Sequence, residues 1–284
     1  MDKPLVILVS GASSGIGRAI VETLTREGHR VIGTSRRASG YPEKAADPGG
    51  AAMIPLDVTD QSSVDQAVSY VYEQYGRLDV LVNNAGFGVA GSVEDTSPEE
   101  AFAQFDTNFF GVHRMVRAVL PLMRAQGSGR IVTVGSVAAI LTVPYQGLYS
   151  ATKHALEALM EAIRIECWSF GIKGVLVEPG DTKTGFTGSR VYCEDTADSP
   201  YCEAFQKAMK TIERSEQGGS GLFRRFTCHS PKKVAKTVCR AVRRKNPPVR
   251  ITVGAAYKLA VFLKRLMPDR VAEFFVGNVY KSDI

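Results

Sequence analysis

The sequence predicts an α/β protein built on a doubly wound parallel sheet, and three observations support this class. First, short apolar runs rich in β-branched residues alternate along the chain with segments of helical periodicity, as buried strands alternate with crossover helices. Second, a glycine-rich turn joins the first apolar run to the first helical segment. Third, the later runs end in small or polar residues, which is typical of a ligand cleft at the carboxyl ends of parallel strands.

Composition places the 284-residue chain among soluble globular proteins, since 44% of its residues are hydrophobic and 23% are charged. No apolar run approaches the roughly 20 residues that span a bilayer, and the N-terminus lacks the basic lead-in and cleavage site of a signal peptide. We therefore expect a cytoplasmic protein. The odd number of cysteines and the absence of C-x-x-C spacing favour reduced thiols and predict no metal site. The five are Cys167, Cys193, Cys202, Cys228 and Cys239.

Charge is unevenly distributed along the chain. Residues 1–200 contain 17 Lys and Arg against 23 Asp and Glu, whereas residues 201–284 contain 18 against 6. This basic last third could face an anionic membrane or an acidic ligand, or it could be an ordinary solvated surface, and both interpretations stay open. We expect no nucleic-acid partner.

The first strand and the turn after it predict a dinucleotide site. Leu5–Val9 is a continuous apolar run, and Ser10–Gly17 leads from it into a helical pattern. Gly11 permits the tight turn, Gly15 lets backbone amides approach a pyrophosphate, and Gly17 lets the helix pack closely on the strand. The helix N-terminus then faces the phosphate charge. The other turn residues expected at the cofactor are Ser13, Ser14 and Ile16.

The second strand, Arg30–Thr34, precedes the residues that indicate the choice of cofactor. Arg36 and Arg37 follow it, with no acidic side chain where an NAD site would place one for the ribose 2′-hydroxyl. Guanidinium groups suit a 2′-phosphate through charge-assisted, often bidentate hydrogen bonds. We therefore favour NADP(H), with a pair of solvated surface arginines as the alternative.

The third strand, Ala51–Leu56, leads to two further candidate cofactor residues, Asp57 and Val58. The Asp57 carboxylate could accept a hydrogen bond from the adenine amino group. Alternatively, it could cap the helix that begins near Asp60 and whose pattern covers residues 61–75.

The fourth strand, Leu78–Val82, ends in amide and small side chains that would line the cleft. A long helical region follows from about 98 to 124, and Asn108 falls within it. Asparagine is a mediocre helix former, so we expect Asn108 to have a hydrogen-bonding role, such as positioning a water near Lys153. The candidate cofactor residues after the fourth strand are Asn84, Ala85 and Gly86.

The stretch from Ser136 to Lys153 contains a candidate acid/base group. Tyr149 and Lys153 are four residues apart and would lie on one face of a helix. A phenol ionises near pH 10, about three units too high for a base at neutral pH, and a nearby ammonium favours the phenolate. Ser136 ends the strand-like run Arg130–Gly135, where its hydroxyl could bond a substrate oxygen that gains charge. An ordinary surface Tyr and Lys is the alternative for so common a spacing.

A sixth strand, Gly174–Glu178, completes an alternation of strands and helices that gives a parallel sheet with right-handed crossovers. With these residues assembled, the chain resembles the short-chain dehydrogenase/reductase family, and in particular its steroid- and retinol-dehydrogenase-like branch. The resemblance covers residues 4–185 and reaches more weakly to a seventh strand at Val249–Val253. The motifs that carry it, in family order, are SGASSGIG at 10–17, Asp57, NNAG at 83–86, Asn108, Ser136, YSATK at 149–153 and PGDTKT at 179–184.

The resemblance implies a Rossmann-like sheet of about seven strands and a catalytic site in which Tyr149 is the acid/base. It also implies that Lys153 contacts the nicotinamide ribose and that Thr184 lies near the nicotinamide or the pyrophosphate. Thr182 stands where the family often has an aliphatic residue, which puts that contact in doubt, and Ser10 stands where threonine is commoner. The implied catalytic residues are Asn108, Ser136, Tyr149 and Lys153, and the last implied cofactor residues are Pro179, Gly180, Thr182 and Thr184.

We expect one domain over residues 1–284, with a substrate lid at 186–228 and a helical extension at 255–284. Apolar lid residues either line a hydrophobic substrate site or pin the lid to the body. In the extension, one apolar helical face, opposed by basic residues, is followed by a break at Pro268. We expect this extension to pack within the chain, where it could cover the substrate cleft, or against a subunit, with membrane docking as the second choice. The apolar residues concerned are Phe186, Tyr192, Tyr201, Phe205, Met209, Leu222, Phe223 and Phe226 in the lid, and Leu259, Phe262, Leu263 and Leu266 in the extension.

These observations together predict an NADP(H)-dependent oxidoreductase that interconverts a hydrophobic secondary alcohol and a ketone, with a steroid-like, retinoid-like or acyl substrate. One alternative is a reductase of small polar or acyl-carrier-bound ketones. Another is a binding protein that senses NADP(H) without catalysis. From the habit of the family we expect a homodimer or homotetramer.

Overall fold

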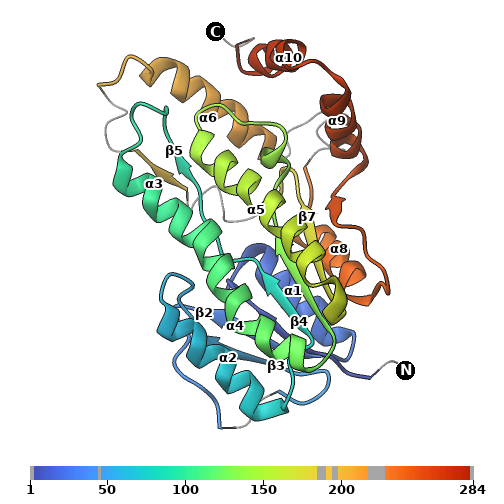
Figure 1. The fold of residues 1–284 in the computed structure, drawn as a ribbon. Helices are drawn as coiled ribbons and strands as arrows, with labels where there is room; N and C mark the ends of the chain where they lie inside the picture. Colours follow the sequence, from blue (N-terminus) through green and yellow to red (C-terminus); the bar gives the residue numbers. More distant parts are fainter. Residues whose placement is uncertain (1–2, 44–45, 184–189, 194–197, 217–227, 282–284) are drawn as a thin grey trace.

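The computed structural model describes residues 3–43, 46–183, 190–193, 198–216 and 228–281, and its centre is a seven-stranded parallel sheet (Figure 1). The strand order is β3-β2-β1-β4-β6-β7-β9. The order reverses between β1 and β4, which is where such sheets bind ligands. The predicted doubly wound sheet is confirmed. Its strands are β1 (Val6–Val9), β2 (Arg30–Ser35), β3 (Ala51–Pro55), β4 (Val80–Asn83), β6 (Gly129–Val134), β7 (Ile172–Glu178) and β9 (Arg250–Thr252).

The predicted strand limits agree with the observed ones to within two residues. The fourth strand begins two residues late because Leu78 is bonded to a side chain instead of to a neighbouring strand. Its N–H donates to Gln126 Oε1 at 2.9 Å, and its carbonyl accepts from Gln126 Nε2 at 3.0 Å. A separate pair of short parallel strands, β5 (Val89–Ala90) and β8 (Val191–Tyr192), joins the predicted lid to the body.

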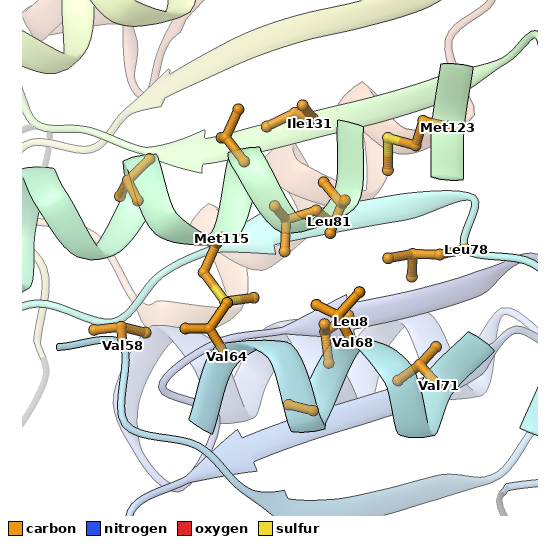
Figure 2. Packing of buried hydrophobic residues seen from close by; sticks show 14 of the residues in the cluster. Leu8, Val58, Val64, Val68, Val71, Leu78, Leu81, Met115, Met123 and Ile131 are labelled. Atoms are coloured by element: carbon orange, nitrogen blue, oxygen red, sulfur yellow. The ribbon is translucent and has the colours of Figure 1, made fainter. Parts of the chain in front are cut away.

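Helices cover both faces of the sheet, and the residues of its five inner strands alternate between two apolar cores. Leu8 faces the core that contains Val68 of α2 and Met115 of α4 (Figure 2). Its neighbours Ile7 and Val9 face the second core, with α1 and α8. This alternation is what a strand buried on both faces requires. The helices named so far are α1 (Gly15–Arg26), α2 (Gln61–Tyr75), α4 (Gly111–Ala125) and α8 (Pro231–Arg243).

The long helix predicted over 98–124 is present, but a π-helical turn at Asp106–Phe110 divides it into α3 (Pro98–Phe105) and α4. The extra residue of a π turn changes which side chains face inward, and such turns are frequent at functional sites. Asn108 lies in this turn and is buried. Ser97 and Glu100 form a capping box that starts α3.

The predicted lid contains α6 (Cys202–Glu216), which packs against the body. Phe205 and Met209 are buried with Ala90 and contact Tyr145, whose ring centroid lies 5.7 Å from that of Phe205. These two side chains therefore pin the lid to the body. Tyr192 and Tyr201 are 42% and 38% exposed. The lid predictions for Phe186, Leu222, Phe223 and Phe226 fall outside the described residues.

The C-terminal extension forms two helices, α9 (Ala255–Leu266) and α10 (Asp269–Lys281), with the predicted break at Pro268 between them. Ser230 caps the preceding helix α8 through its hydroxyl, as its sequence position suggests. The expected packing of the extension within the chain is present on one side of its helices, where Val261 of α9 and Ala272 of α10 are buried. The apolar face of α9 predicted from the sequence lies on the other side, and its four side chains are exposed: Leu259, Phe262, Leu263 and Leu266. A contact of the extension with a subunit stays a prediction. None of the helices in the described ranges is long and apolar enough to cross a membrane.

A buried carboxyl group lies at the carboxyl end of β7. Glu178 is fully buried and accepts a hydrogen bond from Thr252 Oγ1 at 2.7 Å. Burial, followed by the neighbouring Glu157 carboxylate, raises the pKa of Glu178 to about 7. Arg250 forms ion pairs with both Glu157 and Glu161. The cluster links α5 (Gly147–Glu166) to β7 and β9.

Replacing Glu178 with Gln should remove a pH-dependent loss of stability. The native pKa of Glu178 lies above the ordinary value of 4.5, so the folded protein holds a proton that the unfolded chain releases between pH 4.5 and 7. Stability therefore falls as pH rises through this window. Glu178→Gln should match the wild type near pH 4 and exceed its free energy of unfolding by about 3 kcal/mol near pH 8. Urea denaturation at both pH values measures this.

Glu161→Gln is the matched control for that experiment, since Glu161 pairs with the same arginine but its side chain is 53% exposed. The control should show little pH-dependent difference from the wild type. A Glu178→Gln variant whose stability difference is the same at both pH values would contradict the assignment.

Candidate active site

A cleft of about 1210 Å³ opens at the carboxyl ends of the strands, and most of the predicted site residues lie on its wall. This volume is larger than that of an ordinary small-molecule pocket and suits a dinucleotide together with a substrate. Gly17 and Asn108 are buried behind the wall. Thr184 lies outside the described residues. The predicted positions on the wall are Gly11, Ser13, Ser14, Gly15, Ile16, Arg36, Arg37, Asp57, Val58, Asn84, Ala85, Gly86, Ser136, Tyr149, Lys153, Pro179, Gly180 and Thr182.

The turn between β1 and α1 has the geometry of a phosphate cradle. Gly11 and Gly15 have φ values of +65° and +54°, which favour glycine. A Cβ at Gly17 would lie 2.2 Å from the Gly11 carbonyl oxygen, so only glycine fits. Within the described structure, the Ser14 side chain makes no capping hydrogen bond to α1. The first amides of α1 thus remain available to an anion, and these residues fit a dinucleotide pyrophosphate.

Asn84 holds this turn against the end of β4. Its side-chain amide donates to the carbonyl oxygens of Ser10 and Gly11 at 3.1 and 2.9 Å. The Ser10 hydroxyl in turn accepts from the backbone amides of Asn84 and Ala85 at 2.9 and 3.1 Å. Serine at position 10 therefore supplies the hydroxyl that this junction uses.

The arginines and the carboxylate predicted at the adenosine part of the cofactor line the cleft after β2 and β3. Arg36 and Arg37 follow β2, line the cleft and are exposed to solvent. Asp57 Oδ1 accepts from the amide and the hydroxyl of Thr59 at 2.9 and 2.7 Å. The cap of α2 is Asp60, which accepts from the amide of Ser62. The alternative interpretation of Asp57 as a helix cap is therefore wrong.

Tyr149 and Lys153 lie on one face of α5, as their spacing predicts. The Lys153 Nζ atom is 5.6 Å from the centroid of the Tyr149 ring and donates to the Val134 carbonyl at 3.2 Å. Lys153 is only 6% exposed, and this burial lowers its pKa to about 8. The ammonium form still predominates at pH 7. Ser136 follows β6 at the same cleft, and its hydroxyl accepts from the amide of Ala138 at 3.1 Å.

The hydrogen-bonding role expected for Asn108 is present, but its side chain is directed to a loop. Its Oδ1 accepts from the Phe87 amide at 3.0 Å, and its Nδ2 donates to the Phe87 carbonyl at 2.9 Å and to Thr152 Oγ1 at 3.3 Å. A Cβ at Gly86 would lie 2.9 Å from Asn108 Oδ1. Asn108 thus fixes the chain beside Gly86 and Lys153. Its role in positioning a water stays a prediction.

The loop after β7 is supported by residues that the sequence analysis did not identify. Tyr257 of α9 accepts a hydrogen bond from the Asp181 amide at 3.2 Å, and a Cβ at Gly180 would lie 2.0 Å from its ring. Backbone hydrogen bonds join His229 to Asp181 and Lys183 at 2.8 and 2.9 Å. No local sequence signal marks either residue, because they meet the loop across long separations in the chain.

Apolar side chains form the wall of the cleft away from the arginines. They come from the segment after β6, from α6 and from the C-terminal helices, so three separate parts of the chain meet there. Apolar side chains from these three parts include Leu141, Val143, Ile212, Ala260 and Val276. Of the lid residues, Ile212 therefore faces the cleft while Phe205 pins the lid.

A parallel sheet with a glycine cradle, an adjacent Tyr and Lys, and a cleft of a volume that suits a dinucleotide together with a substrate are typical of a dinucleotide-dependent oxidoreductase. The comparison with known families agrees. The family model for short chain dehydrogenases matches residues 5–193. The chain belongs to the short-chain dehydrogenase/reductase family, whose members use a nicotinamide cofactor to act on carbonyl or alcohol groups.

Several known proteins are similar to this chain over nearly its whole length. A 3-ketodihydrosphingosine reductase of Bacteroides thetaiotaomicron is 41% identical and covers 98% of each chain. Retinol dehydrogenase 8 of Bos taurus is 34% identical over 94% of this chain and 87% of its own, which agrees with the branch indicated by the sequence. An NADPH-dependent 3-dehydrocapnine reductase of Ornithobacterium rhinotracheale is 31% identical over 94% of each chain.

Among solved structures, a short-chain dehydrogenase from Streptomyces avermitilis is 34% identical and superimposes with a TM-score of 0.78 over 99% of each chain. The agreement therefore extends beyond the sheet to the C-terminal helices α9 and α10. The expected homodimer or homotetramer stays a prediction, as does the division of the chain into one domain with a lid and an extension.

Replacing Tyr257 with Phe should weaken cofactor binding without unfolding the protein. The ring would still support Gly180, but the Asp181 amide would lose its acceptor. Loss of one such hydrogen bond corresponds to an increase of about three- to tenfold in the Kd for the nicotinamide cofactor. Fluorescence titration with NADPH measures it.

Tyr70→Phe is the control for this experiment, since it removes a hydroxyl that bonds the Pro42 carbonyl on another part of the fold. Its Kd should equal that of the wild type. An unchanged Kd for Tyr257→Phe would show that the hydrogen bond to Asp181 does not contribute to cofactor binding.

Proposed function

We propose that this enzyme uses NADPH to reduce the ketone of a hydrophobic, long-chain substrate. The observation that carries the proposal is the apolar end of the cleft, where Leu141, Val143, Ile212 and Val276 converge from distant parts of the chain. Such walls favour an aliphatic substrate over a sugar or a small polar ketone. Two of the similar proteins are named as reductases, one of 3-ketodihydrosphingosine and one of 3-dehydrocapnine, which supports the direction and the substrate class.

The preference for NADPH is supported by the two arginines that follow β2. Arg36 and Arg37 line the cleft where the adenosine ribose of a dinucleotide would lie, beside Asp57. Residues 35–42 contain no acidic side chain to bind a ribose 2′-hydroxyl. A 2′-phosphate would give both guanidinium groups a ligand of opposite charge. The dehydrocapnine reductase is also NADPH-dependent by name.

In this proposal Tyr149 is the acid that protonates the carbonyl oxygen. The Lys153 ammonium is close to its ring and, with a pKa of about 8, carries a positive charge at neutral pH. That charge favours the phenolate and so lowers the cost of giving up the phenolic proton. The Ser136 hydroxyl also lines the cleft, and it would donate a hydrogen bond to the same substrate oxygen as that oxygen gains negative charge. A bound nicotinamide supplies the hydride.

The proposed reaction predicts which ketones the enzyme reduces. NADPH consumption should be fastest with a long-chain ketone such as 3-ketodihydrosphingosine, slower with steroid ketones and slowest with sugar ketones, because the apolar wall gains most from an aliphatic chain. Tyr149→Phe should lower kcat by at least about 100-fold with unchanged folding, since general acid catalysis contributes this much. Absorbance of NADPH and circular dichroism measure the two effects.

Three results would contradict this function. Preference for a small polar or acyl-carrier-bound ketone would favour the alternative reductase. Retention of kcat in Tyr149→Phe would remove Tyr149 from the mechanism. Tight NADPH binding without turnover of any ketone in the panel would favour a binding protein instead.

The cofactor assignment is tested separately by replacing both arginines. Arg36→Ala/Arg37→Ala should weaken NADPH binding by about 10- to 100-fold, the range expected for hydrogen bonds to a charged group, while NADH binding stays the same. Titration of each cofactor with the wild type and the double variant measures this. Equal losses for NADPH and NADH, or no loss for either, would show that the arginines do not select the 2′-phosphate.

A further inference from the structure

The two C-terminal helices expose a group of large apolar side chains, which we call the C-terminal apolar surface. Its members are between 41% and 68% exposed. Isolated exposed apolar residues are normal, but a cluster of large ones on adjacent helices indicates a binding surface. The residues are Leu259, Phe262, Leu263 and Leu266 of α9, and Val271, Phe274 and Phe275 of α10.

Each helix is already attached to the body by its opposite face. Val261 of α9 and Ala272 of α10 are buried, while Ala260 and Val276 line the cleft. The exposed side chains are therefore not needed to hold the helices in place. Figure 1 shows both helices at the end of the molecule farthest from α2.

Basic side chains border the apolar surface. Lys258 and Arg265 of α9 and Arg270 of α10 are exposed, and Lys264 pairs with Asp269 at 3.0 Å where the two helices meet. Helices with an apolar face and flanking Lys and Arg lie in the interface of a lipid bilayer, with the apolar side chains below the headgroups. The long basic side chains then reach anionic lipid phosphates.

We propose that the C-terminal apolar surface docks on an anionic lipid bilayer. The charges argue against a second copy of this chain as the occupant. A two-fold contact places the same patch of both copies face to face, so the basic border of one copy, formed by Lys258, Arg265 and Arg270, would lie against the basic border of the other. Like charges brought together in this way oppose association, whereas an anionic bilayer offers the opposite charge.

Docking in this way has a consequence for access to the cleft. Ala256 and Ala260 line the cleft one to three residues from Leu259 of the apolar surface, and Val276 lines it directly after Phe275. A bilayer in contact with the surface would therefore lie beside the apolar end of the cleft. Vesicle binding requires no turnover. A failure of the docking proposal can therefore be distinguished from a failure of the proposed reaction.

Vesicle sedimentation with the full chain tests the proposal. The wild type should pellet with vesicles of equal parts phosphatidylcholine and phosphatidylserine at low salt, less at high salt, and weakly with pure phosphatidylcholine. Phe262→Ser/Phe274→Ser should reduce binding to the mixed vesicles by about tenfold or more. Lys258→Gln/Arg265→Gln should reduce binding to the mixed vesicles and leave the weak binding to phosphatidylcholine unchanged.

Phe102→Ser is the matched control, since Phe102 of α3 is 73% exposed and lies outside the surface. It should bind vesicles like the wild type. Equal loss in the control, or no binding of the wild type to the mixed vesicles, would overturn the proposal. So would a dimer in light scattering that the Phe262→Ser/Phe274→Ser variant abolishes in the absence of lipid, because the occupant would then be a second copy.

Discussion

One side-chain amide joins the two strand ends on which the cofactor cradle depends. Asn84 donates to the carbonyl oxygens of Ser10 and Gly11, and Ser10 accepts from two amides that follow β4. The four hydrogen bonds connect β1 and β4 where the strand order of the sheet reverses. Gly17 then fits against the Gly11 carbonyl with no room for a side chain. Because these contacts fix the turn between β1 and α1, they also fix the direction in which the first amides of α1 face the cleft.

The Lys153 ammonium group, which also lies at the cleft, is buried at a cost in stability. Lys153 is nearly buried, and its pKa is lowered by loss of hydration, so folding the protein around a charged Lys153 is unfavourable. The surrounding structure tolerates it because the Val134 carbonyl accepts a hydrogen bond from the ammonium group and the Tyr149 ring lies alongside. Burial of Lys153 therefore lowers the stability of the fold, and it places a positive charge beside Tyr149.

How much of this arrangement could be predicted depends on the distance along the chain between the parts that interact. Tyr149 and Lys153 are one helical turn apart, so their spacing in the sequence fixes their relation, and the strands were recognisable from continuous apolar runs. Tyr257 contacts Gly180, although the two residues are 77 positions apart in the sequence. No local pattern indicates such a contact. Asn108 lies between these cases, because its helix was predictable but the π turn that redirects its side chain was not.

The position of α9 has a thermodynamic consequence. Tyr257 supports the Gly180 loop, and Leu259, two residues along, is exposed to solvent, so one short helix contacts both the cofactor cleft and the exterior. Binding in the cleft and binding at the outer face of α9 are linked when each ligand binds more tightly to one position of this helix than to another. Such a linkage is reciprocal, because the factor by which one ligand changes the affinity of the other is the same in both directions.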